Sequence, residues 1–487
     1  MSDLSLPAKQ GRVNTRQHNL FVVVLLILCI GCDRSKEELP PTPRTEASTI
    51  EFADPEAAST EESFDETNSK TESTVATAVE EPASLEKGNA EIEMADPAAV
   101  RDAAIESLEA GDLDRAFELT RRAKRLDPAN PETVFLNARV LAARNRFAEA
   151  VQALDDLAAA VPEAKLPVLG QTAEWMVLQG RYDEAEKRYT ELLDVVGEGG
   201  LVSRRLAQLF LRQGRRVEAA EHLRVLCREG NIEEVELRAL LSIAKPISGE
   251  QPDNDELEPI GALGRARLLA SGEDWRAARA EIESVGSPSI DESALRARVY
   301  ASVDEFDSLA QWLEGAGKPT ETVPPDGWFA IACLAAHQGK HARAVDALCN
   351  GVQLDPTDAE AYAQLSKSLA ELGMDEQAKD AAMRAELLRQ TQEIGKRMSN
   401  AESPGSEDLA SLIKLLRQLR RPSEALAWSA VATIYAQSRS EISRADAIKK
   451  LEQINQDRLV TASESSDIKQ FILCGIDPEQ LPPGDSQ

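Results

Sequence analysis

The stretch RLDPANPE, Arg125 to Glu132, has a near copy in QLDPTDAE, Gln353 to Glu360. In both, an Asp-Pro pair lies between two segments with helical apolar periodicity. A catalytic motif rarely needs two copies, whereas a structural unit that is stacked many times does. We therefore interpret the two octapeptides as joints between stacked units of one repeat.

Small residues recur at a nearly constant interval around these joints. Two series of alanines run in parallel with steps of 34, 35 and 34 residues, and glycines mark the turns between the series. Each interval holds two apolar-periodic segments of about a dozen residues, which are too short to be stable helices alone in water. Small residues at fixed points let two such helices approach closely, and glycine tolerates the backbone angles of a tight turn. The alanines are Ala104, Ala138, Ala173 and Ala207, then Ala116, Ala150, Ala185 and Ala219; the glycines are Gly111, Gly180, Gly214, Gly339 and Gly373.

This pattern resembles the tetratricopeptide repeat (TPR), a helix-turn-helix unit of about 34 residues. The resemblance implies an all-α fold, a TPR-like α-solenoid of stacked helix-turn-helix hairpins. It places a first array at 97–233, degenerate TPR-like repeats at 234–324 and a second array at 325–392. C-terminal TPR-like or capping helices at 393–460 and a tail at 461–487 follow. Within the degenerate part, 259–289 and 290–324 are looser copies, and half a unit is missing from 234–258.

The charge of the chain argues against one class of partner. Among 487 residues, 84 are Asp or Glu and 55 are Lys or Arg, which gives a formal net charge of −29. Phosphate binding needs clustered Lys and Arg, and the sequence has no basic stripe of that kind. We therefore expect no nucleic-acid partner.

The amino terminus reads as an export signal. Lys9, Arg12 and Arg16 precede an apolar run of 12 residues, Leu20 to Gly31, whereas a membrane-spanning helix takes about 20. The sequence LCIGC that ends this run resembles the lipobox of bacterial lipoproteins, although its first cysteine stands where that family usually has leucine. The resemblance implies cleavage after residue 31 and a lipid on Cys32. The alternative is an uncleaved signal anchor. Both predict an exported, membrane-attached protein that faces the periplasm or the cell exterior, and both leave open which membrane holds it.

An acidic segment lies between this leader and the repeats. Residues 33–96 contain 18 acidic and 5 basic residues, are rich in Pro, Thr and Ser, and show no apolar period. Such a segment cannot bury enough apolar area to offset its ordering entropy. We therefore expect 32–96 to be a disordered acidic linker.

The sequence offers no convincing set of catalytic or metal-binding residues. His337 and His341 have the spacing of a zinc-binding helix, but Gly339 between them marks a turn. The segment GAGKPT, residues 315–320, lacks the serine or threonine of a phosphate loop, and DNDE, residues 253–256, lacks the glycine of a calcium loop. Cys227, Cys333, Cys349 and Cys474 show no disulfide framework, and we expect free, buried thiols. We therefore expect a non-enzyme without cofactor or metal.

The TPR resemblance also implies where a partner binds, because in that family the stacked first helices line a groove for a peptide or a partner helix. Two interpretations of its arginines are open: they attract a carboxylate-bearing segment, or they are solvated or paired with neighbouring glutamates. The lysine and asparagine clamp that some family members use for chaperone tails is not matched. The predicted groove positions are Arg101, Phe135, Arg139, Glu174, Arg204, Gln208, Leu211, Arg212, Phe329, Cys333, His337, Ala363, Lys367 and Glu371.

Together these features predict a membrane-anchored TPR scaffold that binds proteins or peptides and assembles complexes in the bacterial cell envelope. The alternative is an accessory or regulatory subunit of an envelope enzyme or export machine. The sequence does not identify the partner.

Overall fold

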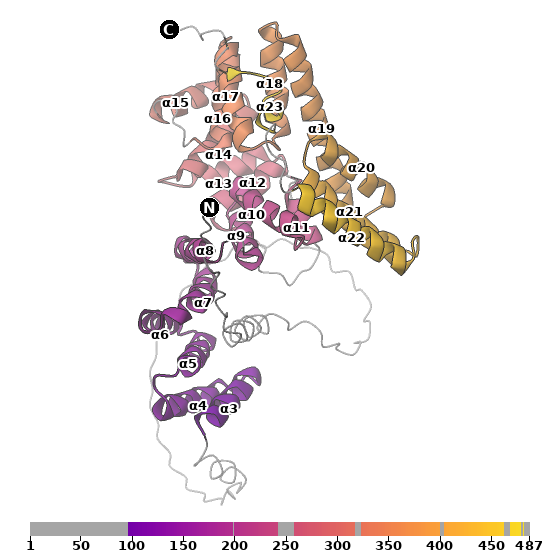
Figure 1. Cartoon of the computed structure of the whole chain (residues 1–487). Coiled ribbons are helices and arrows are strands. Elements are labelled where there is room, and N and C mark those ends of the chain that lie inside the picture. The colour runs from indigo at the N-terminus through magenta and orange to yellow at the C-terminus, as the bar shows by residue number, and fades with distance from the viewer. Residues whose placement is uncertain are drawn as a thin grey trace, which may run out of the picture. The chain divides into compact units, whose positions relative to one another are not determined.

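The computed structural model describes residues 96–197, 199–241, 258–316, 323–399, 404–461, 468–478 and 481. These residues form helices and no strand, and the helices follow one another as hairpins (Figure 1). The predicted fold class, an all-α array of stacked helical hairpins, is therefore confirmed. The predicted leader, Cys32 and the acidic linker up to residue 95 lie outside the described residues, as does the DNDE motif at 253–256.

The chain divides into two compact units, and the first ends at Pro167. Its described part contains two hairpins, and in each of them the two helices pack against each other, α3 against α4 and α5 against α6. A short 3-10 helix follows them. The elements are α3 (Pro97–Glu109), α4 (Leu113–Leu126), α5 (Pro131–Ala143), α6 (Phe147–Ala160) and η2 (Pro162–Ala164).

The two octapeptides are joints, as predicted. In RLDPANPE, α4 ends at Leu126 and α5 begins at Pro131, while the Asn130 side chain accepts hydrogen bonds from the backbone N–H groups of Glu132 (2.9 Å) and Thr133 (3.2 Å). In QLDPTDAE, Asp358 caps the next helix in the same way, with two backbone donors at 3.0 Å. A side-chain oxygen at this position satisfies N–H groups that have no partner inside the helix.

The turn glycines and the two alanine series also have the predicted roles. Gly111, Gly180, Gly214, Gly339 and Gly373 all have positive φ, between 72° and 77°, which only glycine adopts without a steric cost. All eight alanines of the two series are at most 1% exposed. The close approach of the helices is therefore built on these small side chains.

The second unit begins at Val168 and contains the rest of the helices. Its hairpins are joined by short turns, apart from the stretches outside the described residues. The helices are α7 (Lys165–Leu178, which begins before the boundary), α8 (Tyr182–Val196), α9 (Gly200–Arg212), α10 (Arg216–Glu229), α11 (Glu234–Ala239), α12 (Gly261–Ser271), α13 (Trp275–Glu283), α14 (Ile290–Ser302), α15 (Phe306–Ala316), α16 (Pro325–His337), α17 (His341–Leu354), α18 (Ala359–Glu371), α19 (Asp375–Ser399), α20 (Ser406–Gln418), α21 (Pro422–Ser438), α22 (Arg444–Thr461) and α23 (Ile468–Ile472).

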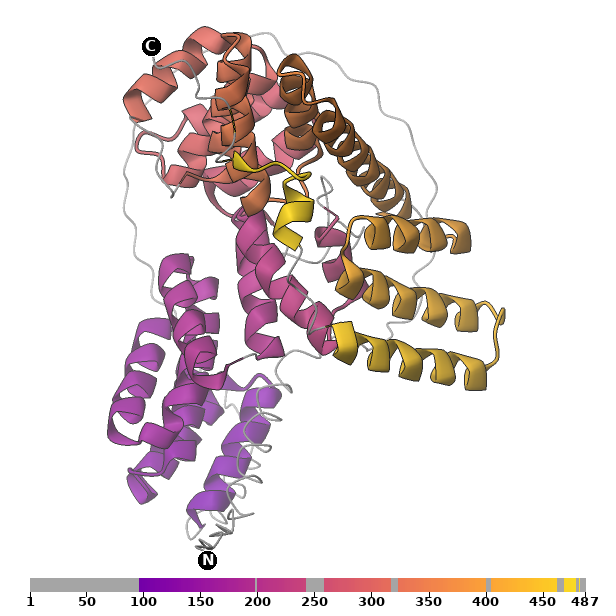
Figure 2. The same ribbon diagram turned by 45° about the horizontal axis from the view of Figure 1, so that its top comes forward.

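A late hairpin of the second unit packs against an early one. α21 contacts α10 and α11, and Trp428, which is fully buried, shares a hydrophobic core with Leu223 and Leu226 of α10 (Figures 1 and 2). The Arg421 guanidinium donates a hydrogen bond of 2.6 Å to the carbonyl of Leu240. In an open solenoid each repeat contacts only its neighbours, so this contact is an addition that the repeat pattern did not predict.

Two features depart from the predicted division of the C-terminal part. α19 runs for 25 residues and passes the expected boundary at 392/393 without a break, because its apolar residues Leu388, Ile394 and Met398 are buried along its whole length. Part of the segment expected to be a tail is folded: α23 is followed by Leu473, Cys474 and Ile476, which are 3–5% exposed.

The alanine positions provide a stability test of this packing. We expect Ala138→Leu to lower the free energy of unfolding by about 1–3 kcal/mol, because Ala138 on α5 has no exposed surface and a larger side chain must displace its neighbours. Ala159→Leu on the exposed side of α6 is the control and should change it by less than about 0.5 kcal/mol. Denaturant unfolding followed by circular dichroism measures both, and equal values would contradict the assigned repeat register.

Candidate functional site

The predicted groove residues lie on the first helices of their hairpins. In the first unit, Arg101 is on α3, and Phe135 and Arg139 are on α5. In the second unit, α9 carries Arg204, Gln208 and Arg212, α16 carries Phe329 and α18 carries Lys367. In each compact unit, the first helices of the hairpins together form one surface, and we call this surface the first-helix face of that unit.

Several arginines of this face join neighbouring elements. Arg101 pairs with Glu132 at 3.1 Å, from α3 to the first turn of α5. Arg204 pairs with Glu236 of α11 at 2.6 Å, and the Glu236 side chain is only 7% exposed. Arg212 donates a hydrogen bond of 3.1 Å to the carbonyl of Glu258. Pairing with neighbouring glutamates, one of the two interpretations left open by the sequence, therefore describes Arg101 and Arg204.

Two cations of the predicted groove remain available. Arg139 is partly exposed and Lys367 is exposed, and neither forms a hydrogen bond or an ion pair within the part of the chain that the structure describes. Phe135 is also partly exposed, whereas Phe329 is 8% exposed and lies under the Arg298 guanidinium, whose carbon is 4.2 Å from the ring centroid.

The second unit contains a buried charge cluster that the sequence analysis missed. Arg298 of α14 is the centre of this cluster, with a side chain that is 10% exposed. It pairs with Asp326 of α16 at 3.2 Å and with the cap residue Asp358, and it reaches Glu360 of α18 at 2.6 Å. Arg267 of α12 pairs with the other oxygen of Asp326 at 2.6 Å. These five residues, the charge cluster, connect four successive first helices.

The two aspartates of the cluster, Asp326 and Asp358, stay ionised although they are buried. Burial alone would raise the pKa of Asp326, but the guanidinium groups of Arg267 and Arg298 hold that pKa well below its usual range. Burial acts in the same direction on Asp358, and the charge and hydrogen bonds of Arg298 lower its pKa below the ordinary value. Buried charges are tolerated because each is paired and hydrogen-bonded.

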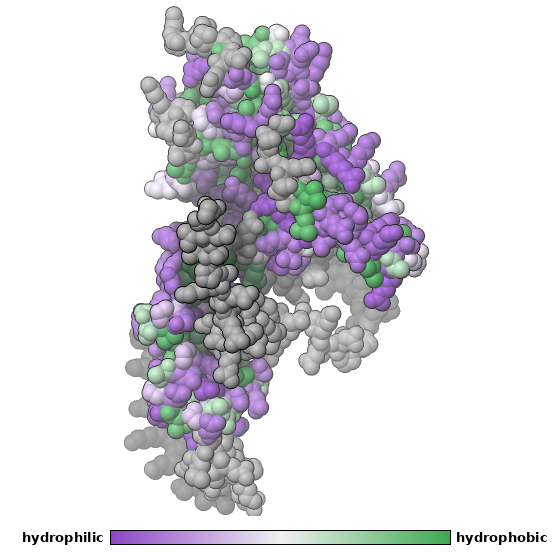
Figure 3. All heavy atoms as spheres, viewed as in Figure 1, coloured by the Kyte–Doolittle hydropathy of each residue, from purple (hydrophilic) through white to green (hydrophobic). Residues whose placement is uncertain are grey.

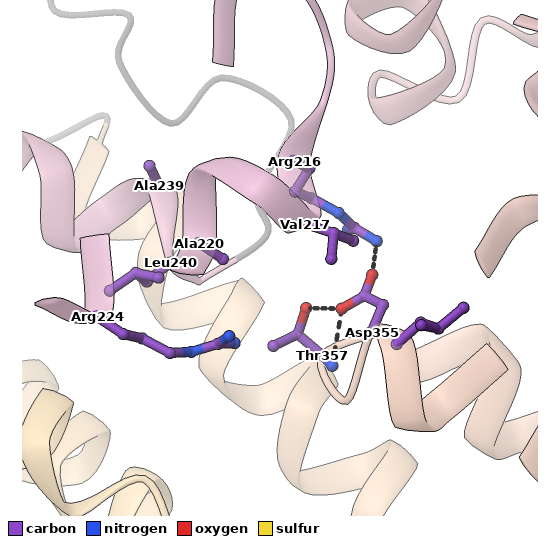
Figure 4. Close-up of a pocket in the computed structure, with 9 residues that line it drawn as sticks. Arg216, Val217, Ala220, Arg224, Ala239, Leu240, Asp355 and Thr357 are labelled. Carbon is purple, nitrogen blue, oxygen red and sulfur yellow. Dashed lines mark hydrogen bonds and ion pairs between the residues drawn. The ribbon is translucent and has the colours of Figure 1, made fainter. Parts of the chain in front are cut away.

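A related ion pair joins a second helix of the array to the second octapeptide. Arg216, at the start of α10, pairs with Asp355, whose other oxygen accepts hydrogen bonds from the Thr357 backbone N–H (3.0 Å) and hydroxyl (2.6 Å) (Figure 4). The cavity beside this pair has a volume of about 10 Å³, which is the space that one water needs. It is therefore not a small-molecule site, and Asp355 fixes the joint.

Other features that the sequence singled out show no ligand chemistry in the described residues. No group of His, Cys, Asp and Glu there could hold a metal ion, and no described helix is both long and apolar enough to cross a membrane. His337 ends α16 and stacks on Phe306 with ring centroids 3.8 Å apart, while His341 begins α17. The four described cysteines are free, as expected, and three of them are buried.

The signal that could have identified the charge cluster is the repeat register. Arg267 and Arg298 occupy the ninth position of the units 259–289 and 290–324, where other units have Arg139, Gln208 and Lys367. The acidic partners Asp326 and Glu360 occupy the second position of later units, as Glu132 does in the first array. The units 259–289 and 290–324 match the repeat only loosely, so their ninth positions are hard to recognise from the sequence.

Comparisons with known proteins agree with the repeat. Residues 107–166 and 179–231 match models of the tetratricopeptide repeat, so the chain contains tetratricopeptide repeats in these segments. A search of curated protein sequences gave no match. The solved structures similar to this chain include a tetratricopeptide repeat protein from Parabacteroides merdae, with 14% identity, TM-score 0.25 and coverage of 56% of this chain and 98% of that chain.

Two further similar structures are complexes. One is the APC/C hetero-tetramer Cut9-Hcn1, with 14% identity, TM-score 0.27 and coverage of 79% of this chain and 96% of that chain. The other is Naa15/Naa10 bound to HypK-THB, with 15% identity, TM-score 0.26 and coverage of 76% and 69%. No conclusion about partners of this chain follows from them.

The charge cluster predicts a strong effect of removing its central cation. We expect Arg298→Ala to lower the free energy of unfolding by about 3–5 kcal/mol, because it leaves buried carboxylates without their partner. Arg389→Ala is the control, because the Arg389 side chain is 51% exposed and pairs with Glu386 one turn away on the same helix. It should lower the free energy of unfolding by less than about 1 kcal/mol. Denaturant unfolding measures both, and similar losses would show that the cluster is not a structural centre.

The lowered pKa of Asp326 predicts a contribution to acid sensitivity. Its folded pKa lies below the unfolded value of about 3.9, so its stabilising effect is complete above that value and is lost as the pH falls. We expect the free energy of unfolding to fall more steeply between about pH 5 and pH 3 in the native chain than in Asp326→Asn, which takes up no proton there. Chemical unfolding at several pH values measures the slopes, and equal slopes would contradict the assignment.

Proposed function

We propose that this chain is a scaffold that binds protein partners through the first-helix faces of its helical repeats. The observation that carries the proposal is the repeated hairpin array itself, because its matches are to the tetratricopeptide repeat. Its first helices also carry Arg139 and Lys367, which have no acidic partner among the described residues. By contrast, Arg101, Arg204, Arg267 and Arg298 pair with carboxylates of neighbouring repeats. The scaffold acts by holding partners and has no catalytic step of its own.

The available cations favour a particular partner chemistry. Arg139 and Lys367 are positive positions on a chain whose formal net charge is −29. A partner segment with a carboxylate gains a charge-assisted hydrogen bond at either position, and the acidic surroundings disfavour segments of high negative charge. The partner segment is therefore a helix or an extended peptide with isolated acidic residues.

The proposed location is the bacterial cell envelope. Support comes from the basic residues, the short apolar run and Cys32 at the amino terminus, which resemble a lipoprotein signal. A lipidated Cys32 attaches the scaffold to a membrane, and the acidic segment 33–96 separates the repeats from its surface. The alternative role is an accessory subunit that recruits or regulates one envelope enzyme or export machine.

Site-specific photo-crosslinking in intact bacterial cells tests partner binding. A photoreactive amino acid replaces Lys367 on α18 in one variant and Lys379 on α19 in the control; both lysines are exposed and belong to the same hairpin. We expect a discrete crosslinked product from position 367 and none from 379. The purified product protein should then bind the full chain, and Lys367→Glu should weaken that binding by about tenfold or more.

The outcomes of this experiment separate the two roles. Products of equal yield from both positions would contradict binding on the first-helix face. One enzyme as the main product, with a rate that changes when the scaffold is deleted, would favour the accessory role. Cys32→Ser is a further arm: it should release the chain from the membrane fraction, whereas retention there would contradict the lipid anchor and favour an uncleaved signal anchor.

A further inference from the structure

The C-terminal segment, residues 468–476, packs against the second unit although it belongs to no hairpin, and we call the surface that it covers there the cleft. It begins with the five-residue helix α23 and lies beside α17 in the space bounded by α17, α18 and α19 (Figures 1 and 2). Leu473, Cys474 and Ile476 are 3–5% exposed and join the hydrophobic core of these three helices. A helix of this length has no stability of its own, so the cleft determines its structure.

Polar and aromatic contacts also hold the segment in the cleft. The Phe471 ring faces two guanidinium groups, with the central carbon of Arg384 3.6 Å and that of Arg420 4.4 Å from the ring centroid. Tyr362 donates a hydrogen bond of 3.0 Å to the main-chain carbonyl of Ile472. Two guanidinium groups thus contact the aromatic side chain of the segment, and one hydroxyl contacts its main chain.

The charge of this cleft is not balanced by its present occupant. Arg384 is only 7% exposed, and its guanidinium donates to the Tyr362 hydroxyl at 3.3 Å, but no carboxylate of the described residues pairs with it. Arg420, in the turn between α20 and α21, has no ion pair in that part of the chain either. Residues 468–476 contain Lys469 and no acidic residue, and the exposed Asp477 that follows them forms no ion pair with Arg384 or Arg420. A buried guanidinium usually pairs with a carboxylate, which a ring face replaces only in part.

We propose that this cleft is a second binding site, for a partner segment that carries an aromatic residue next to acidic ones, and that residues 468–476 cover it as a competitor within the same chain. The incoming segment places its ring between Arg384 and Arg420 and its carboxylates on their free donors. The site goes beyond the proposed function, because it uses α17, α18, α19 and the turn after α20 instead of Arg139 and Lys367.

On the face drawn in Figure 3, hydrophilic residues cover most of the surface of the described helices and hydrophobic residues lie between them in small groups. Ile468 is 45% exposed, and the apolar residues that follow Phe471 are turned into the core. Displacement of the segment would therefore expose a larger apolar surface that only another segment can cover.

Peptide binding to the purified full chain tests the proposal. The probe is a fluorescent peptide of residues 468–476 in which Lys469 and Gln470 are replaced by glutamate and Cys474 by serine, so that it carries no thiol. We expect Phe471→Ala in the protein to tighten probe binding by about tenfold, because the competitor then occupies the cleft for less of the time. In that background Arg420→Gln should weaken binding by about tenfold. Arg417→Gln, which removes the same charge from an exposed position of α20, is the control and should leave the affinity unchanged.

Thiol labelling of the native chain tests displacement without a substitution. Cys474 is 5% exposed in the cleft, and Cys227 is 1% exposed in the core around α10. Saturating probe should speed maleimide labelling of Cys474, measured by mass spectrometry, and leave Cys227 unchanged. Equal labelling with and without probe, equal effects of Arg417→Gln and Arg420→Gln, or cooperative loss of helicity in Phe471→Ala would each overturn the proposal, the last because the segment is then an integral part of the core. None of these results depends on crosslinking at Lys367.

Discussion

The fold depends on the close approach of paired helices at alanine. Ala104, Ala138, Ala173 and Ala207 are essentially unexposed, and any larger side chain at these points would separate the helices. Each helix is short, so it is stable only while its apolar side is covered by the other helix of the hairpin and by the next hairpin. The glycine turns and the side-chain caps at residues such as Asn130 and Asp358 support this contact, since they fix where the adjoining helices end or begin. The binding faces are a consequence of this stacking.

Sequence reasoning recovered the features that depend on local chemistry. Turn glycines, capped joints and buried alanines repeat at a fixed interval, and each is required wherever two helices meet in the same way, so the fold class followed from them. The contact of α21 with α10, and the pairing of Arg216 with Asp355 139 residues away, are not periodic and leave no local signal. Arg267 and Arg298 are an intermediate case. Their positions follow the period of the repeat and could be predicted, but the repeats that contain them match the pattern only loosely.

Charge on a repeat surface has two different uses in this molecule. Some arginines join one helical repeat to the next, because their carboxylate partners belong to the following repeats. These are Arg101, Arg204, Arg267 and Arg298. Arg139 and Lys367 lie at the same kind of position without such partners within the described residues. A count of cations on the first helices therefore overstates what a ligand can contact. The candidate site could be predicted from the sequence as a set of positions, but which cations remain available depends on the three-dimensional pairing.

The return of α20 and α21 onto α10 has a consequence for biosynthesis. Leu226 and Trp428 share one core, yet roughly 200 residues separate them, and ribosomes add about 5–20 residues per second. The nascent chain therefore carries the bare apolar side of α10 for roughly 10–40 s before its cover is translated. During this interval the incomplete polypeptide is a substrate for chaperones. A ribosome that stalls before α21 leaves a product whose exposed apolar surface is prone to aggregation.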